Sequence, residues 1–167
     1  MGEYYCKNFW TLYGLETVSL RYFNVFGPRQ DPKNKYANVI PLFIEGLYRK
    51  KPLEIHWDGK QSRDFCYIDN VVLANLLAMK APKAAGETFN IGGHQEISLL
   101  DFLKSLKKIM KASEVKLNFK PKRAGDVRRT FADISKARGI LGYRKIIRFE
   151  EGLRRTVRWF LEHPEYF

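Results

Sequence analysis

The sequence predicts an α/β protein, because stretches with helical periodicity alternate along the chain with short strands rich in β-branched and aromatic residues. Residues 3–13 carry aromatic side chains at helical spacing and are followed by Gly14, a residue that favours the end of a helix. Residues 17–25 have the composition of a buried strand, and Gly27 and Pro28 after them predict a loop. A helix followed by a buried strand is typical of a parallel α/β layer.

The rest of the chain continues this alternation. The Asp58-Gly59 pair predicts a tight turn, which we expect to join its two flanking strands into a small hairpin. Asp69 and Ser98 precede helical patterns, and each can cap a helix by accepting a hydrogen bond from a free backbone N–H. The further elements expected are helices at 39–49, 71–80, 99–111, 134–141 and 149–162 and strands at 53–57, 63–68, 87–91 and 114–119.

The net charge of +12 fits an anionic ligand, nucleic acid or a solvated surface. The lysine and arginine residues are spread over several segments instead of being gathered in one tail, so a solvated surface explains most of them. Nucleic acid is disfavoured as a partner, since no helix-turn-helix pattern, RNA-binding sheet motif or basic arm occurs in the sequence.

Apolar runs and cysteines limit the compartment and the cofactors. No apolar run approaches the length of a membrane span, and the first residues lack the layout of a signal peptide. We therefore expect a soluble, cytoplasmic protein without a membrane partner. Cys6 and Cys66 lie far apart without a CxxC motif or a Cys/His cluster, so we expect buried free thiols and neither a disulfide framework nor a metal site.

Arginine side chains recur beside strands in three short stretches, residues 21–29, 59–67 and 123–128. Ligands of parallel α/β sheets bind beyond the carboxyl ends of the strands, where such loops meet. Arginine suits phosphate because its planar guanidinium donates two hydrogen bonds at once and stays charged. We therefore expect one anion site, in which Asp126 either orients Arg123 or accepts a hydrogen bond from a sugar hydroxyl.

These stretches belong to a longer series of motifs. In chain order the series is GEYY (2–5), RYFNVFGPRQ (21–30), SRDFCYIDN (62–70), FNIG (89–92), GDVR (125–128), ADISKA (132–137) and LGY (141–143). With these motifs, almost the whole chain resembles extended short-chain dehydrogenase/reductase enzymes that act on nucleoside-diphosphate sugars. It is most similar to UDP-glucose, UDP-N-acetylglucosamine and UDP-glucuronate 4-epimerases. The resemblance implies a partial Rossmann-type sheet plus the small substrate-binding lobe of such an enzyme.

The resemblance also implies roles for individual residues. The implied contacts are Asn24, Arg63 and Arg123 at the diphosphate, Asn38 and Val39 along the nucleotide, Asp126 at the ribose hydroxyls, and Tyr22 near the nicotinamide of NAD. For Asn38 and Val39 the alternative is a plain helix start, and for Tyr22 it is a core aromatic side chain.

Two motifs of this family do not occur in the 167 residues: the Gly-rich turn that holds the pyrophosphate of NAD, and the YxxxK pair. We expect the family's catalytic Tyr and Lys to lie just before Met1, which makes residues 1–167 a single truncated domain, the C-terminal half of an NAD-dependent nucleotide-sugar epimerase or dehydratase. His56, His94 and His163 offer no substitute, because none lies near a Ser or Cys nucleophile motif. We expect no catalytic residue here and no NAD binding by this chain alone.

The leading hypothesis is a UDP-sugar-binding lobe that is inactive alone and competent for 4-epimerisation when a partner provides the NAD-binding half. An incomplete sheet exposes an apolar strand edge and helix face, so we expect a homodimer or association with a separate NAD-binding half. The alternative is a non-catalytic oligomeric interaction protein derived from such an enzyme. The identity of the sugar, and the choice among epimerase, decarboxylase and dehydratase, stay open.

Overall fold

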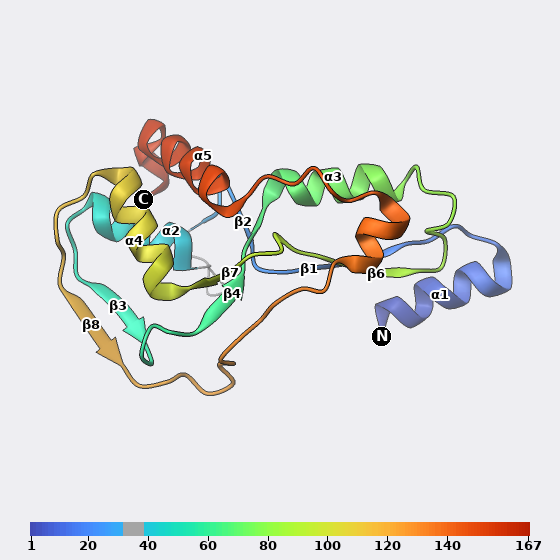
Figure 1. The fold of residues 1–167 in the computed structure, drawn as a ribbon, viewed down its shortest axis with the longest axis horizontal. Helices are drawn as coiled ribbons and strands as arrows, with labels where there is room; N and C mark the ends of the chain where they lie inside the picture. The colour runs from blue at the N-terminus through green and yellow to red at the C-terminus, as the bar shows by residue number, and fades with distance from the viewer. Residues whose placement is uncertain (32–38) are drawn as a thin grey trace.

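The computed structural model describes residues 1–31 and 39–167, whose helices and strands alternate along the chain (Figure 1). The α-helices are α1 (Gly2–Tyr13), α2 (Val39–Tyr48), α3 (Ile68–Ala78), α4 (Leu99–Met110) and α5 (Phe149–Glu162). The strands are β1 (Ser19–Tyr22), β2 (Val25–Phe26), β3 (Leu53–His56), β4 (Ser62–Asp64), β5 (Cys66–Tyr67), β6 (Thr88–Ile91), β7 (Glu96–Ser98) and β8 (Leu117–Lys120). A π-helical turn, η1 (Ala137–Leu141), and a short 3-10 helix, η2 (Pro164–Tyr166), complete the described elements.

The strands pair two by two across long stretches of sequence. β1 is parallel to β6, β2 to β5 and β3 to β8, whereas β4 is antiparallel to β7. Parallel strands need crossover connections, and the helices between them supply these crossovers. The predicted α/β class is therefore confirmed.

The expected hairpin around Asp58 and Gly59 is wrong. β3 pairs with β8, and β4 pairs with β7, a strand that the sequence pattern did not reveal. Gly59 does lie in a turn with a φ of 71°, but Trp57 before it also has a positive φ of 64°. Long-range pairing, and not this local turn, decides the partner of each strand.

The strand expected at residues 17–25 is interrupted and is less buried than predicted. β1 and β2 are separated by Phe23 and Asn24, and Asn24 has a positive φ of 33°. Arg21 and Tyr22 in β1 are exposed, because β6 is the single strand that pairs with β1 among the described residues. The opposite edge of β1 therefore has no partner strand in this part of the chain.

Most helix ends agree with the expectations. Gly14 ends α1 in the left-handed conformation, and the Ser98 hydroxyl caps α4 by accepting a hydrogen bond from the Asp101 N–H. The cap expected at Asp69 is wrong: α3 begins one residue earlier, and Asp69 lies in its first turn, where a carboxylate still interacts favourably with the helix dipole. The helix expected at 134–141 begins at residue 135 and continues as the π-helical turn η1, which ends at Leu141 with Gly142 as its C-cap.

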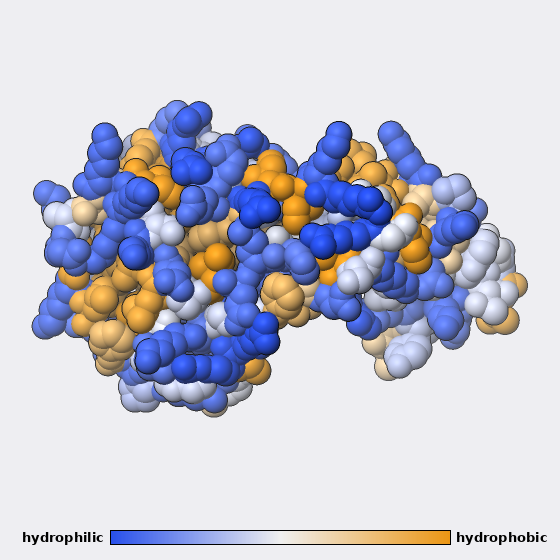
Figure 2. Space-filling model, in the orientation of Figure 1, coloured by the Kyte–Doolittle hydropathy of each residue, from blue (hydrophilic) through white to orange (hydrophobic). Residues whose placement is uncertain are grey.

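Two hydrophobic cores lie at opposite ends of the elongated molecule (Figure 1). One core joins α2, α4 and α5 through Ile44, Phe102 and Phe160, all fully buried. The other joins α3, β6 and η1 and contains Phe89 and Ile91. Hydrophilic side chains cover much of the face in Figure 2, with apolar patches between them. Within the described segments, no helix has both the length and the apolar character to cross a membrane.

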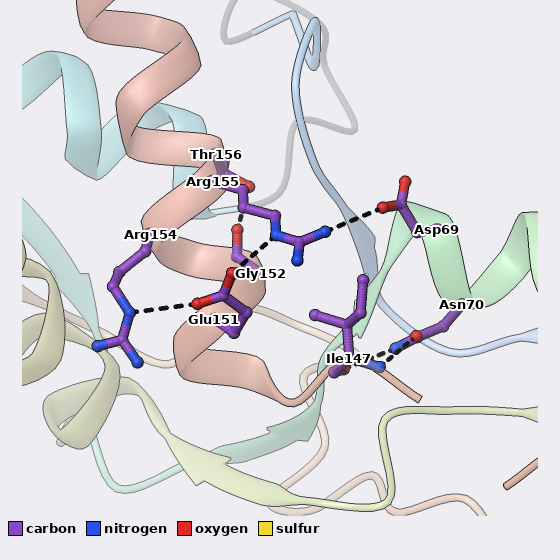
Figure 3. Close-up of polar contacts among 8 residues, drawn as sticks. All are labelled: Asp69, Asn70, Ile147, Glu151, Gly152, Arg154, Arg155 and Thr156. Atoms are coloured by element: carbon purple, nitrogen blue, oxygen red, sulfur yellow. Dashed lines mark hydrogen bonds and ion pairs between the residues drawn. The ribbon is translucent and has the colours of Figure 1, made fainter. Parts of the chain in front are cut away.

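The two ends are joined by polar contacts between α3 and the segment that leads into α5 (Figure 3). The amide of buried Asn70 donates to the carbonyl of Ile147 at 2.8 Å and accepts from the N–H of the same residue at 2.7 Å. Arg155 of α5 contacts Asp69 at 3.4 Å and is oriented by Glu151 at 2.8 Å. The buried amide pair, with both polar groups of Ile147 satisfied, is the stronger link, because the ion pair is exposed to water.

The core beside β5 contains two buried ionisable side chains, Tyr143 and Cys66. The Tyr143 hydroxyl donates to the Gly92 carbonyl at 3.1 Å and lies 3.8 Å from the Cys66 sulfur. Burial raises the pKa of the Cys66 thiol from 9.0 to about 11, and burial also raises the pKa of Tyr143. Because the folded-state pKa is above the unfolded one, this contribution to stability is complete below pH 9 and is lost as the pH rises through about 11.

Alkaline pH is therefore expected to destabilise the fold through Cys66. Between pH 9 and 11 the free energy of unfolding should fall by about 3 kcal/mol on account of this thiol, at about 1.4 kcal/mol per pKa unit. Urea unfolding of the wild type and of Cys66→Ala across this range measures the slope, which should be shallower in the variant. Cys6→Ala, a substitution on partly exposed α1, is the matched control, and equal slopes in all three proteins would contradict the prediction.

Candidate functional site

A cavity of about 540 Å³ opens beside α2, β3 and β4. The predicted substrate residues that line it are Asn24, Val39, Arg63, Arg123 and Asp126. Asn38 lies outside the described residues. The structure therefore brings side chains from distant parts of the sequence to one cavity, while their roles in binding stay predictions.

Arg63, in the middle of β4, is held in place at one end of its guanidinium group. Its Nη1 donates to the carbonyls of Ser62 at 2.8 Å and Val127 at 2.9 Å, and its Nη2 donates to Asp126 Oδ1 at 2.9 Å. Asp126 therefore orients Arg63, and not Arg123 as the sequence also allowed. These contacts use three of the five N–H groups of the guanidinium, and among the described residues the Nε–H and the second N–H of Nη2 have no partner.

Arg123 reaches the cavity from the loop after β8. Its Nη2 lies 2.8 Å from Nε2 of His56, at the end of β3. Within residues 1–31 and 39–167 it forms no ion pair with a carboxylate, whereas Arg63 is paired with Asp126. The charge of Arg123 is therefore the less neutralised of the two arginine charges in the cavity wall.

The loop that carries Arg123 and Asp126 has a defined shape. The Asp126 N–H donates to the Arg123 carbonyl at 3.1 Å, and Gly125 between them has a φ of 80°, which closes a tight turn. Further along, Arg128 donates two hydrogen bonds of 2.8 Å to Asp58 and lies over the Trp57 ring. These contacts fix the loop against the end of β3.

Asn24 lies between β1 and β2, where the left-handed conformation suits asparagine better than most residues. Its amide N–H donates to the Asp64 carbonyl at 3.1 Å and to the Thr130 hydroxyl at 3.2 Å. The side chain therefore joins three separate segments beside the cavity.

The cavity is lined by both apolar and charged side chains. Phe43, Leu53, Phe65 and Leu99 belong to the apolar part of the lining, and Arg63 and Arg123 belong to the charged part. The carboxylate of Glu54 is occupied by Lys120 at 3.6 Å. Such a cavity can hold an apolar ring beside an anion. No group of three or more His, Cys, Asp or Glu that could hold a metal ion occurs in the part of the chain that the structure describes.

Tyr22, the predicted cofactor residue, is not part of this cavity. It lines a second cavity of about 580 Å³ between β1 and α3, together with Asn75, Met79 and Lys80. Its hydroxyl and the Asn75 amide are within hydrogen-bond distance, at 3.0 and 3.2 Å, and about half of Tyr22 is exposed. The alternative of a buried core aromatic is therefore wrong, and the cofactor role stays a prediction.

Sequence reasoning missed two residues that line the first cavity. His56 contacts Arg123, and the Gln61 amide supports the His56 carbonyl at 2.8 Å. It also missed Asp64, which is fully buried beside Arg63 in β4 and accepts hydrogen bonds from the N–H groups of Ala132 and Gln95; its burial raises its pKa above the ordinary value. The opposite orientations of Arg63 and Asp64 follow from the strand, in which neighbouring side chains point to opposite faces.

Comparison with known proteins identifies the class of protein that this fold and cavity define. The NAD dependent epimerase/dehydratase family matches residues 1–92. A UDP-glucuronate 4-epimerase from Thermodesulfobacterium geofontis is 39% identical over 157 residues, which cover 92% of this chain and 46% of that protein. The chain belongs to the NAD-dependent epimerase/dehydratase family.

The solved structures that are similar to this chain include 4-epimerases. A UDP-glucose 4-epimerase from Thermotoga maritima, solved with UDP-glucose, is 41% identical with a TM-score of 0.89 over 96% of this chain and 50% of that one. A UDP-glucuronic acid 4-epimerase from Bacillus cereus, solved with UDP-glucuronic acid and NAD, is 34% identical with a TM-score of 0.86 over the same shares. These neighbours confirm the expected Rossmann-type fold of the extended short-chain dehydrogenases. The chain spans about half the length of the curated relatives it matches.

Proposed function

We propose that residues 1–167 form the nucleotide-sugar-binding part of a UDP-sugar 4-epimerase. The observation that carries the proposal is the meeting of Asn24, Val39, Arg63, Arg123 and Asp126 in the lining of one cavity. Relatives with UDP-sugars in their solved structures have the same fold at 34 to 41% identity.

The chemistry of the cavity suggests how each group binds. The Nε–H of Arg63 and the guanidinium of Arg123 donate to the diphosphate, where charge-assisted hydrogen bonds are strongest. The carboxylate of Asp126 has one oxygen on Arg63, which leaves the other to accept from a ribose hydroxyl. Val39, the first described residue of α2, lies along the nucleotide, and Asn38 before it is assigned the same role from the resemblance alone.

NAD, when bound in this family, supplies hydride transfer. The described residues do not fit its pyrophosphate: the cavity beside Tyr22 is lined by Glu16 and Lys80 among apolar groups, and the sequence contains no Gly-rich turn or YxxxK pair. We therefore propose that this chain binds the sugar nucleotide and that residues beyond these 167 hold NAD and supply the catalytic Tyr and Lys. In that arrangement Tyr22 contributes to the edge of the nicotinamide site.

Exposed apolar groups support a partner for the face formed by α1 and β1. No residue of α1 is buried, and Tyr4, Leu12 and Tyr13 are each exposed by more than two thirds. β1 also has an edge without a strand among the described residues. A second copy of the chain or an NAD-binding half would cover these surfaces.

Calorimetric titration of residues 1–167 with UDP-glucose, UDP-N-acetylglucosamine and UDP-glucuronate tests the proposal. We expect micromolar binding of at least one sugar nucleotide, weak binding of free glucose, and 4-epimerisation only after co-expression with an NAD-binding half. A folded chain that binds none of the three at millimolar concentration would overturn the assignment. Release of carbon dioxide or water from the sugar would replace epimerase by decarboxylase or dehydratase.

The alternative function is a non-catalytic oligomeric interaction protein, which the exposed aromatic residues of α1 favour. It predicts a tight oligomer that is indifferent to UDP-sugars. Sedimentation velocity with and without UDP-glucose, on the same samples as the titration, separates the two functions: an oligomer without any nucleotide binding would support the alternative.

A further inference from the structure

The end of β3 presents one histidine to the cavity. Along β3 the buried side chains of Leu53 and Ile55 alternate with the less buried Glu54 and His56, so the latter two lie on the same face of the strand, and both line the cavity. The backbone of His56 is fixed by its register with Lys120 in β8 and by the Gln61 amide, which donates to its carbonyl. The imidazole therefore has a defined position.

The two ring nitrogens of His56 have different partners, and these partners determine its tautomer. Nδ1 lies 3.3 Å from the Pro121 carbonyl, which can only accept, so Nδ1 carries the proton. Nε2 is then an unprotonated acceptor, and it lies 2.8 Å from Nη2 of Arg123, which can only donate. One neutral ring thus contacts the loop after β8 at Pro121 and again at Arg123.

Protonation of this ring would break the second contact. A proton on Nε2 would place a donor against the Arg123 donor and one positive charge against another. The nearby carboxylates are already engaged, Glu54 with Lys120 and Asp126 with Arg63. The charged groups around the ring are Glu54 on β3, Lys120 on β8, Lys122, Arg123 and Asp126 on the loop, and Arg63 on β4.

We propose that His56 is a positioning residue for nucleotide-sugar binding: its neutral Nδ1–H tautomer holds the Arg123 guanidinium in the cavity wall, ready for the diphosphate. The inference rests on the proposed function and adds a residue that the family resemblance did not supply.

Titration with UDP-glucose at pH 7.5 tests the consequence for binding. His56→Ala should be about tenfold weaker than the wild type, the effect of losing one hydrogen bond to a charged group. His56→Gln should recover part of the affinity, because its amide oxygen can accept from Arg123. His163→Gln, beside Trp159, is the matched control and should keep the wild-type affinity.

A second measurement needs no ligand. Long-range ¹H–¹⁵N spectra of the free chain should show His56 protonated at Nδ1 near neutral pH, and Arg123→Gln should shift its Nε2 resonance. An Nε2–H tautomer, an unchanged Nε2 resonance in that variant, or equal affinities of the wild type and His56→Ala would each overturn the inference. If the folded chain binds no UDP-glucose, the proposed function fails, and the spectra alone decide whether His56 positions Arg123.

Discussion

Substitution of Arg63 by alanine is expected to weaken UDP-glucose binding by at least about a hundredfold, which corresponds to about 2.7 kcal/mol. The guanidinium is fixed by two backbone carbonyls and by Asp126, so its two remaining N–H donors can bind a ligand without first losing rotamer freedom. Calorimetric titration measures the loss. Arg63→Lys keeps the charge but lacks the planar fork, and should lie between the wild type and the alanine variant.

Controls separate binding from folding in this experiment. Arg63 also connects β4 to Val127, so the circular dichroism spectrum and the urea midpoint of each variant are needed beside its affinity. Arg154→Ala removes an exposed arginine of α5 outside the cavity lining, and should bind UDP-glucose like the wild type. A folded Arg63→Ala protein with unchanged affinity would remove Arg63 from the proposed diphosphate site.

Substitution of Asn70 by alanine is expected to lower the free energy of unfolding by about 3 kcal/mol. Asn70 is 1% exposed, and its amide satisfies both the N–H and the carbonyl of Ile147. Truncation leaves two backbone groups without these partners at the link between the two cores, and unsatisfied buried polar groups carry a full desolvation penalty. Urea or thermal unfolding measures the change.

The adjacent ion pair provides the comparison for Asn70. Arg155→Ala removes the exposed contact with Asp69 and should lower the free energy of unfolding by less than about 1 kcal/mol. If the two variants were equally stable, the buried amide pair would not be the principal link between α3 and the segment before α5.

Local patterns in the sequence predicted the elements whose ends are set by local chemistry. Gly14 ends α1 and Ser98 caps α4 as expected, because each depends on a residue and its nearest neighbours. The partners of β3 and β4 were not predictable in this way, since they lie far along the chain and are chosen by long-range packing. The start of α3 was also not predicted. The cap was expected at Asp69, but Tyr67 has the extended backbone of an N-cap, so the helix begins at Ile68.

The sequence predicted several of the side chains that line the candidate site, but not how they pair with one another. Arginine-bearing loops at strand ends pointed to one anion site, and Arg63 and Arg123 do line one cavity. The pairing of Asp126 with Arg63, and of Arg123 with His56, was not predictable, because both depend on the path of the loop after β8. The sequence alone does not indicate which charged group a histidine at the end of a strand contacts.

Helix α1 contacts the rest of the molecule through few side chains. The Trp10 indole lies directly over Gly86, at a place where any Cβ atom would collide with the ring. Among the described residues, the polar contacts between α1 and the rest of the molecule include the Glu3–Arg21 ion pair and the hydrogen bond from the Thr17 hydroxyl to the Cys6 carbonyl. No residue of α1 belongs to either hydrophobic core, so substitutions on its exposed face should alter the surface that a partner meets and leave both cores unchanged.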